Sequence, residues 1–273
     1  MFRISLCLLL SVVVTSFAQM VEFPLGSLVI DVTKDPYNAK GDGKVDDTEA
    51  IQQALDDHPD GDFIIYLPHG VYKISKQLSW PRADEPEKSY RRTILQGESM
   101  GGTILMLEDN CRGFENPETP RALLYTGVGP LPRYRNAIRD ISLRTGKGNP
   151  GAIGIRFNAA TQGTILNVKI YSGDGAGVAG IDMGFAENIG PLLVKNVEIK
   201  GFDVGIFTRT PFFGMTLEHI YLSEQKNTGS KIMTRPSPSA ICEVAMPFLL
   251  FTMQANTRCL LLLMVPLNMS QGK

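Results

Sequence analysis

The sequence has few residues that could cross-link the chain or bind a metal. It contains four cysteines, and between Gln19 and Gly229 the only one is Cys111, so this part of the chain can form no internal disulfide. The three histidines are scattered, without the spacing of a metal site. The body of the protein must therefore be stabilised by its apolar core, and 273 residues with 43% hydrophobic content are enough for a large one.

An excess of charge of either sign is also missing, since 27 Lys and Arg residues face 28 Asp and Glu residues. A balance of this kind gives no reason to expect a nucleic acid or an anionic membrane surface as partner. Composition and spacing indicate one domain without an inter-domain linker.

No apolar run is long enough to span a bilayer, but the first twenty residues have the pattern of a secretory signal. Arg3 supplies the positive charge, residues 4–14 the short apolar stretch, and Ser16-Phe17-Ala18 the small-residue cleavage site. We therefore expect residues 1–18 to be a signal peptide. The mature protein would be secreted, extracellular or periplasmic, and would have no membrane association after cleavage.

The body of the chain repeats a short pattern of strand residues. An apolar-x-polar-apolar-x-apolar motif occurs four times, with its polar residue at Asp140, Asn167, Asn196 and His219, so that the separations are 27, 29 and 23 residues. A second series, Gly-Ile-x-x, interleaves with it at Gly154, Gly180 and Gly205. Two strand series that repeat together in the same order are typical of successive turns of a solenoid.

Alternation along these strands predicts which side chains face the interior. Eight apolar residues should form inward aliphatic stacks: Ile141, Leu143, Val168, Ile170, Val197, Ile199, Ile220 and Leu222. The four polar residues share one level of the repeat and should lie at a bend between strands, as a structural ladder. Upstream, we expect strands at 28–32, 63–67, 70–74, 93–96 and 103–106, and loops at 80–92 and 108–135.

A glycine-rich turn before the repeats leads into an amphipathic helix. Gly41 and Gly43 permit unusual backbone angles, Asp46 can cap the first helical turn, and Glu49 would complete a capping box. Ile51, Ala54 and Leu55 then share one face, which could close the end of an apolar core.

The segment from Ala39 to Leu55 resembles the N-terminal signature of the pectate-lyase-like superfamily, the proteins related to glycosyl hydrolase family 28. The resemblance extends from about Leu28 to Gly229. It implies an all-β fold, a right-handed parallel β-helix with a short N-terminal capping helix, together with secretion and a polysaccharide partner. We expect residues 19–229 to be this domain, in truncated form.

The tail from 230 to 273 does not continue the strand pattern. Glycine disappears from Ser230 until Gly272, and leucine-rich fragments replace the repeats. The degenerate codons for this tail, read one base earlier, permit a sequence that looks far more like a β-helix. We therefore interpret the tail as aberrant and hypothesise a shift of the reading frame near Gly229. Under this hypothesis the chain is an inactive fragment.

Glycoside hydrolysis needs a pair of carboxyl groups, one on each side of the scissile bond and about 5 to 9 Å apart. Several acids occupy outward or turn positions of the array, among them Asp174, Glu198 and Glu218. Asp182, Glu187 and Asp203 are the catalytic candidates, because they cluster around the second strand series. For each of them, a solvated surface acid or a turn former is the alternative interpretation.

Sugar rings stack on aromatic faces, and arginine pairs with uronate carboxylates. Trp80, Tyr90, Arg91 and Arg92 could form such a substrate subsite within one loop, and residues 133–135 offer a second. The alternative is that these side chains anchor their loops to the flank of the helix.

Catalytic residues cannot be assigned through the resemblance. The chain has no Asn-Thr-Asp, Gly-His-Gly or Arg-Ile-Lys motif of the family 28 polygalacturonases, and no Arg-x-Pro-x-x-Arg motif of pectate lyases. We expect a glycoside hydrolase without a cofactor. The alternatives are a lyase acting by β-elimination, for which Ca²⁺ could neutralise the uronate, and a non-catalytic carbohydrate-binding β-helix.

Overall fold

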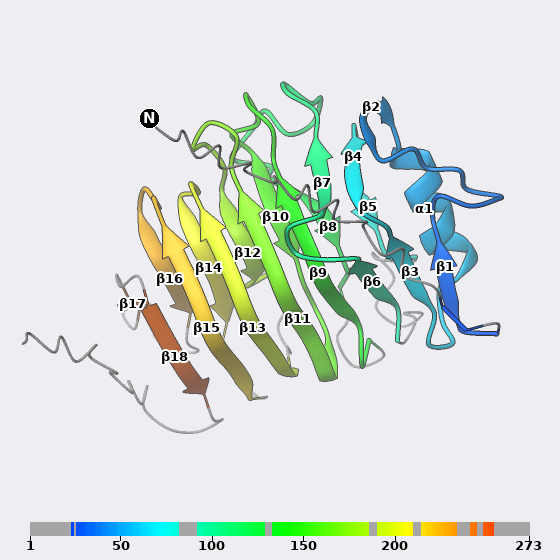
Figure 1. The fold of residues 1–273 in the computed structure, drawn as a ribbon. Coiled ribbons are helices and arrows are strands. Elements are labelled where there is room, and N and C mark those ends of the chain that lie inside the picture. The colour runs from blue at the N-terminus through cyan, green and yellow to red at the C-terminus, as the bar shows by residue number, and fades with distance from the viewer. Residues whose placement is uncertain are drawn as a thin grey trace, which may run out of the picture.

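Parallel strands from successive coils stack into two sheets that face each other across an apolar core (Figure 1). The computed structural model describes residues 23–24, 26–81, 92–128, 133–185, 190–209, 214–233, 241–244 and 248–253. Within these ranges, one sheet has eleven strands and the other seven. The expected parallel β-helix is confirmed.

The first sheet runs in the order β1-β3-β6-β9-β11-β13-β15-β18, and β2, β4 and β7 join it beside β9. Its strands are β1 (Val29–Asp31), β2 (Asp42–Asp46), β3 (Ile64–Leu67), β4 (Gly70–Ile74), β6 (Ile94–Gly97), β7 (Thr103–Leu107), β9 (Ala137–Arg144), β11 (Ala160–Tyr171), β13 (Gly190–Lys200), β15 (Met215–Ser223) and β18 (Phe248–Met253). The second sheet runs β17-β16-β14-β12-β10-β8-β5. Its strands are β5 (Leu78–Ser79), β8 (Arg121–Tyr125), β10 (Ala152–Arg156), β12 (Ala179–Met183), β14 (Val204–Arg209), β16 (Thr228–Met233) and β17 (Ile241–Val244).

The inward stacks form as the alternation predicts. Val168 pairs with Ile141 on one side and with Val197 on the other, and Val197 pairs with Ile220. These four side chains are at most 2% exposed, and the second stack of Leu143, Ile170, Ile199 and Leu222 lies two residues further along the same strands. Each coil thus buries its apolar row against the next, which is how a solenoid obtains its stability.

The polar ladder is also confirmed, and its bonds run from side chain to side chain. Asp140, Asn167, Asn196 and His219 all have φ between 52° and 57°, which bends each long strand at the same level. Asn167 Nδ2 donates to Asp140 Oδ1 at 2.7 Å, and Asn196 Nδ2 donates to Asn167 Oδ1 at 2.8 Å. Asp and Asn tolerate this left-handed conformation better than other residues with a side chain, which explains their recurrence at the bend.

The recurring Gly-Ile pair is explained by close contact between the sheets. A Cβ atom on Gly154 would lie 2.4 Å from Cγ2 of Ile170, and one on Gly180 would lie 2.3 Å from Cγ2 of Ile199. Glycine at these positions of the second sheet therefore allows the isoleucines of the first sheet to fill the core.

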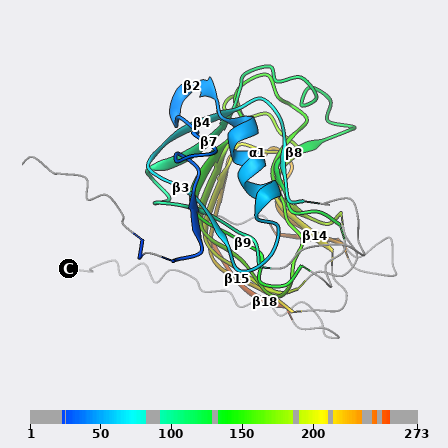
Figure 2. The same ribbon diagram turned by 90° about the vertical axis from the view of Figure 1, so that its right-hand side faces the viewer.

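Helix α1 (Thr48–Asp57) covers the end of the coil, with Ile51, Ala54 and Leu55 buried as expected (Figure 2). Gly41 and Gly43 have positive φ, in agreement with the turn that we predicted. The predicted capping box is wrong. The N-cap residue is Asp47, and its carboxylate accepts hydrogen bonds from the backbone of Lys40 and Gly41 at 2.6 and 2.9 Å instead of from the helix.

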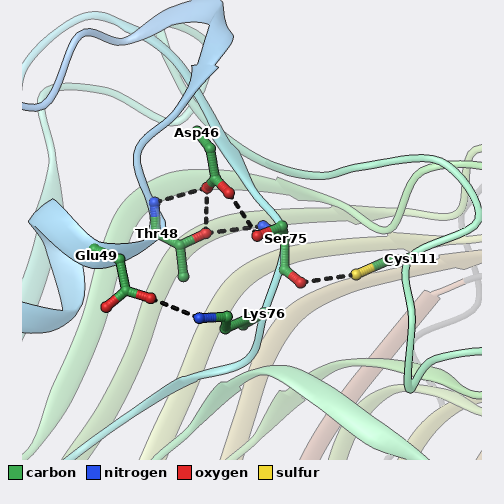
Figure 3. Close-up of polar contacts among 6 residues, drawn as sticks. All are labelled: Asp46, Thr48, Glu49, Ser75, Lys76 and Cys111. Carbon is green, nitrogen blue, oxygen red and sulfur yellow. Dashed lines mark hydrogen bonds and ion pairs between the residues drawn. The ribbon is translucent and has the colours of Figure 1, made fainter.

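Asp46 and Glu49 instead bind the segment directly after β4 (Figure 3). Asp46 accepts hydrogen bonds from the amide of Thr48 at 3.0 Å and from Oγ of Ser75 at 2.5 Å, and Glu49 forms a 2.7 Å ion pair with Lys76. Cys111 Sγ donates to the carbonyl of Ser75 at 3.1 Å, and Cys111 is a free, buried cysteine. Contacts distant in sequence thus outcompete the local capping pattern.

The five upstream strands lie within one residue of their predicted ranges at each end. The expectation of a loop throughout 108–135 is wrong, because β8 lies within it. This strand has buried residues at four consecutive positions, since both of its faces are covered, so it shows no alternation that could predict it.

The polarity of strand pairing changes near the end of the chain. Strand β16 still pairs in parallel with β14, whereas β17 pairs antiparallel with β16 and β18 antiparallel with β15. The change falls in the segment that we expect to be aberrant, 230–273, and that interpretation stays a prediction. The expected signal peptide, 1–18, lies outside the described residues. No helix among the described residues is long and apolar enough to cross a membrane.

Candidate functional site

Asp182 lies on the outward face of β12, between the inward-facing Ile181 and Met183. Its Oδ2 accepts a hydrogen bond from Nε of Arg156 on β10 at 3.0 Å, and its Oδ1 accepts one from the amide of Gly184 at 2.9 Å. The residue is only 6% exposed. The two hydrogen bonds fix the orientation of the Asp182 carboxyl group.

Aromatic side chains cover this ion pair. Phe185 lies with its ring centroid 5.5 Å from Cζ of Arg156, and it packs edge-on against Tyr125 of β8 at 5.7 Å. Tyr125, Arg156 and Asp182 are directly opposite one another on three adjacent strands. The cluster therefore combines a carboxylate, a cation and two aromatic rings at the C-terminal ends of neighbouring strands.

The structure does not bring Asp203 to this cluster. The amide of Asp203 donates to the carbonyl of Gly177 ahead of β12, whereas Asp182 lies near the end of that strand. Four residues of strand separate the two levels, which corresponds to roughly 13 Å. Glu187 lies outside the described residues. The catalytic role of the three acids stays a prediction.

The structure separates the predicted substrate-binding residues. Trp80 is 1% exposed and belongs to the apolar core, so its ring has no free face for a sugar. Arg92 forms an ion pair with Asp62, and its amide donates to the carbonyl of Tyr134. The burial of Trp80 favours the alternative interpretation, in which this side chain anchors its loop. Tyr90 and Arg91 lie outside the described residues.

A groove of about 580 Å³ lies on the outward face of the first sheet, past the bend. We call it the outer groove, and its charged and aromatic lining consists of Asp109, Arg144, Lys147, Tyr171, Glu198 and Lys200. Arg144, Tyr171 and Lys200 are the final residues of β9, β11 and β13, which lie side by side in Figure 1. A hollow of about 200 Å³, lined in part by His219 and Tyr221, adjoins the groove at Glu198.

The carboxylate of Glu198 contacts two other side chains at the outer groove. It forms a 3.1 Å ion pair with Nζ of Lys169 and accepts a hydrogen bond from the hydroxyl of Tyr171. Burial raises the pKa of Tyr171 above its usual value, and the hydrogen bond and negative charge of Glu198 raise it further. Tyr171 therefore remains protonated at neutral pH.

No group of three or more His, Cys, Asp or Glu side chains that could hold a metal ion occurs among the described residues. The outward acids Glu198 and Glu218 are visible in the sequence. Their ion-pair partners Lys169 and Lys195 lie on neighbouring coils, so the pairs can be found only once the register between coils is known. The same reason hides the Arg156–Asp182 pair, whose members are 26 residues apart.

Residues 29–241 match the model of a protein family described as rhamnogalacturonase A/epimerase, pectate lyase-like. A probable rhamnogalacturonase A from Aspergillus oryzae is 24% identical over 205 residues, which are 68% of this chain and 41% of that protein. A probable glucan endo-1,3-beta-glucosidase from Arthroderma benhamiae is 32% identical over 129 residues, 46% of this chain and 13% of that protein. The chain thus matches well under half the length of either relative.

Among solved structures, the catalytic domain of Agl-KA superposes with a TM-score of 0.52 at 14% identity, and the match covers 78% of this chain and 35% of that one. A likeness at this level of identity supports the fold alone.

Proposed function

Because the chain belongs to the rhamnogalacturonase A/epimerase family of pectate-lyase-like proteins, we propose that it is a carbohydrate-active enzyme, specifically a glycoside hydrolase. Its substrate would be an extracellular acidic polysaccharide of the pectin type, and the protein would be secreted to reach it. The name of the Aspergillus oryzae relative supports a pectin-type substrate.

The observation that carries the proposal is the buried, outward-facing carboxylate of Asp182. Asp182 is 6% exposed, its carboxylate accepts hydrogen bonds from Arg156 and Gly184, and the ring of Phe185 lies against Arg156. A carboxylate in a fixed orientation can act as the base or nucleophile of glycoside hydrolysis. It can also stabilise the positive charge that develops on the sugar ring.

A second carboxyl group has to protonate the leaving oxygen. Asp203 is too far from Asp182 for either stereochemical outcome, since the upper limit of the required separation is about 9.5 Å. Glu187 follows Asp182 by five residues in the chain. Glu187, the remaining member of the predicted set, is the candidate for this general acid.

The charge state of Tyr171 argues against elimination at the outer groove. A lyase needs a base that removes the proton next to the uronate carboxylate. Tyr171 is the titratable hydroxyl at the centre of the groove, and its raised pKa keeps it protonated. Tyr171 is therefore not a candidate for the base of an elimination at this groove.

The experiment is an incubation of the full chain with a panel of plant, algal and fungal polysaccharides, followed by two assays of the products. We expect new reducing ends from an acidic substrate without absorbance of an unsaturated product in the ultraviolet. Ultraviolet-absorbing products would show that the enzyme is a lyase and not a hydrolase. Binding without either product would favour a non-catalytic β-helix.

A further inference from the structure

We propose that the outer groove is a binding site for an acidic oligosaccharide, separate from the cluster around Asp182. The ligand class rests on the proposed function, and the location and the residues rest on the geometry of the groove. The two sites would allow one glycan chain to be held on the first sheet while another part of it meets the second sheet.

The residues along the groove form a regular row across the coils. Met106, Arg144, Tyr171 and Lys200 are direct neighbours on β7, β9, β11 and β13. Adjacent strands are spaced by about 4.8 Å, so the four side chains form a row of roughly 14 Å. A linear oligosaccharide that lies along this row would meet a new side chain at each coil.

Two cations on this surface have no charged partner. Neither the guanidinium of Arg144 nor the ammonium group of Lys147 forms an ion pair with any described residue, and both residues are exposed. The neighbouring Lys200, by contrast, forms a 3.0 Å ion pair with Glu224, and Lys169 is paired with Glu198. Arg144 and Lys147 are therefore available to a ligand carboxylate, and Arg can bind it through two parallel hydrogen bonds.

Tyr171 lies in the row between Arg144 and Lys200 and supplies a half-buried aromatic ring. Its hydroxyl is bound to Glu198, which fixes the ring and lowers the entropic cost of stacking against a sugar. Gly146 and Gly173 line the same surface and have no side chains that could obstruct it. The volume of about 580 Å³ lies within the range of ligand sites in proteins.

The site is distinct from the Asp182 cluster because it lies on the other sheet. Arg144, Tyr171 and Lys200 end strands of the first sheet, whereas Arg156 and Asp182 belong to β10 and β12 of the second. An uncharged glycan could accept only weaker hydrogen bonds from Arg144 and Lys147 than a carboxylate does, so the groove should discriminate by charge.

The test measures binding of hexagalacturonate to the full chain by isothermal titration calorimetry, with carboxyl-reduced hexagalacturonate as the neutral comparison. We expect Arg144→Ala/Lys147→Ala to weaken binding of the acidic hexamer at least tenfold. Tyr171→Ala should weaken it about fivefold, while Tyr171→Phe, which keeps the ring, should stay within twofold of the wild type.

The matched control is Lys34→Ala/Lys44→Ala, which removes the same charge from two exposed lysines near the capping helix. It should leave binding unchanged, and thermal melts should show that all variants are folded. Equal affinity of the wild type for the acidic and the reduced hexamer would overturn the proposal. An equal loss of affinity in the control and in Arg144→Ala/Lys147→Ala would overturn it too, since binding would then follow net charge alone.

The outcome can be separated from that of the proposed function. If the groove variants lose binding and the wild type cleaves no polysaccharide, the proposed binding site is supported and the proposed hydrolase activity is rejected. If the wild type cleaves an acidic polysaccharide and the groove variants bind the hexamer normally, the proposed hydrolase activity is supported and the proposed binding site is rejected.

Discussion

Cys111 and Asp46 meet at Ser75, where helix α1, strand β4 and the segment after β7 come together (Figure 3). The two side chains should respond to solution conditions in different ways, because one is a buried thiol and the other an exposed carboxylate. Both responses can be measured.

We predict that Cys111 is inert toward alkylation in the folded protein. Burial, reinforced by the negative charges of Glu108, Asp46 and Glu115, raises the pKa of the thiol to about 11, so little thiolate exists at pH 7.5. Iodoacetamide labelling followed by peptide mapping should find this cysteine unmodified in buffer and modified in urea. Rapid labelling in buffer would contradict the buried position.

Asp46 should make folding sensitive to acid. Burial alone would raise the pKa of Asp46, but hydrogen bonds from Ser75 and Thr48 outweigh it and hold the pKa below the ordinary value of 3.8. A carboxyl group whose pKa is lower in the folded state stabilises the fold above 3.8, and this contribution is lost as the pH falls through the folded-state pKa.

We therefore predict that Asp46→Asn lowers the free energy of unfolding by about 1 kcal/mol at pH 7, because it weakens the hydrogen bonds from Thr48 and Ser75. The difference from the wild type should shrink between pH 5 and pH 3. Urea denaturation at several pH values measures both quantities. A difference that is constant over this range would show that the hydrogen bonds do not depend on the charge of Asp46.

At the scale of elements, the bend in the long strands depends on the polar ladder. Asn167→Ala removes the bonds to Asp140 and Asn196 and places alanine at φ 54°. We expect a loss of about 2 to 3 kcal/mol in the free energy of unfolding. Asn167→Gly, which accepts this φ, should be about 1 kcal/mol less destabilising than alanine. If both variants had equal stability, the backbone conformation would not be what selects asparagine.

The elements show how far the sequence alone can predict this protein. The strands, the inward stacks and the polar ladder follow from local alternation and from the repeat of 23 to 29 residues, both of which are visible in the sequence. The capping box could not be predicted correctly, because Asp46 and Glu49 bind Ser75 and Lys76, which follow β4 and are distant in sequence. Strand β8 was missed because both of its faces are buried.

The site was less predictable than the fold, because its contacts join residues of different coils that are distant in sequence. Asp182 was recognised as an outward acid, but its partner Arg156 lies one coil away and Phe185 is an ordinary apolar residue in the sequence. The sequence leaves the role of Trp80 open, because aromatic residues near charged segments occur both in cores and in binding sites, and its burial favours a core position. Which side chains meet at a site depends on the register between coils, and the composition of the sequence does not reveal that register.

At the scale of the whole molecule, the two outward faces differ in chemistry. The second sheet presents the enclosed Asp182 cluster, and the first presents the outer groove with its unpaired cations. Binding at the groove should depend on salt, since interactions between exposed charges are screened within about 8 Å at physiological ionic strength. Raising the salt concentration from 0.05 to 0.5 M should weaken binding of hexagalacturonate several-fold in a titration. An affinity independent of salt would exclude a role for Arg144 and Lys147.

The measurement that tests the central claim most directly is the rate of reducing-end release from an acidic polysaccharide by the wild type and by Asp182→Asn. The variant keeps the shape of the side chain and removes its charge. We predict hydrolysis by the wild type and a loss of at least about a hundredfold in the variant. The variant should melt at a lower temperature, because Arg156 loses its ion pair, but should remain folded at the assay temperature. Equal rates for the two folded proteins would contradict the assignment of the reaction to Asp182.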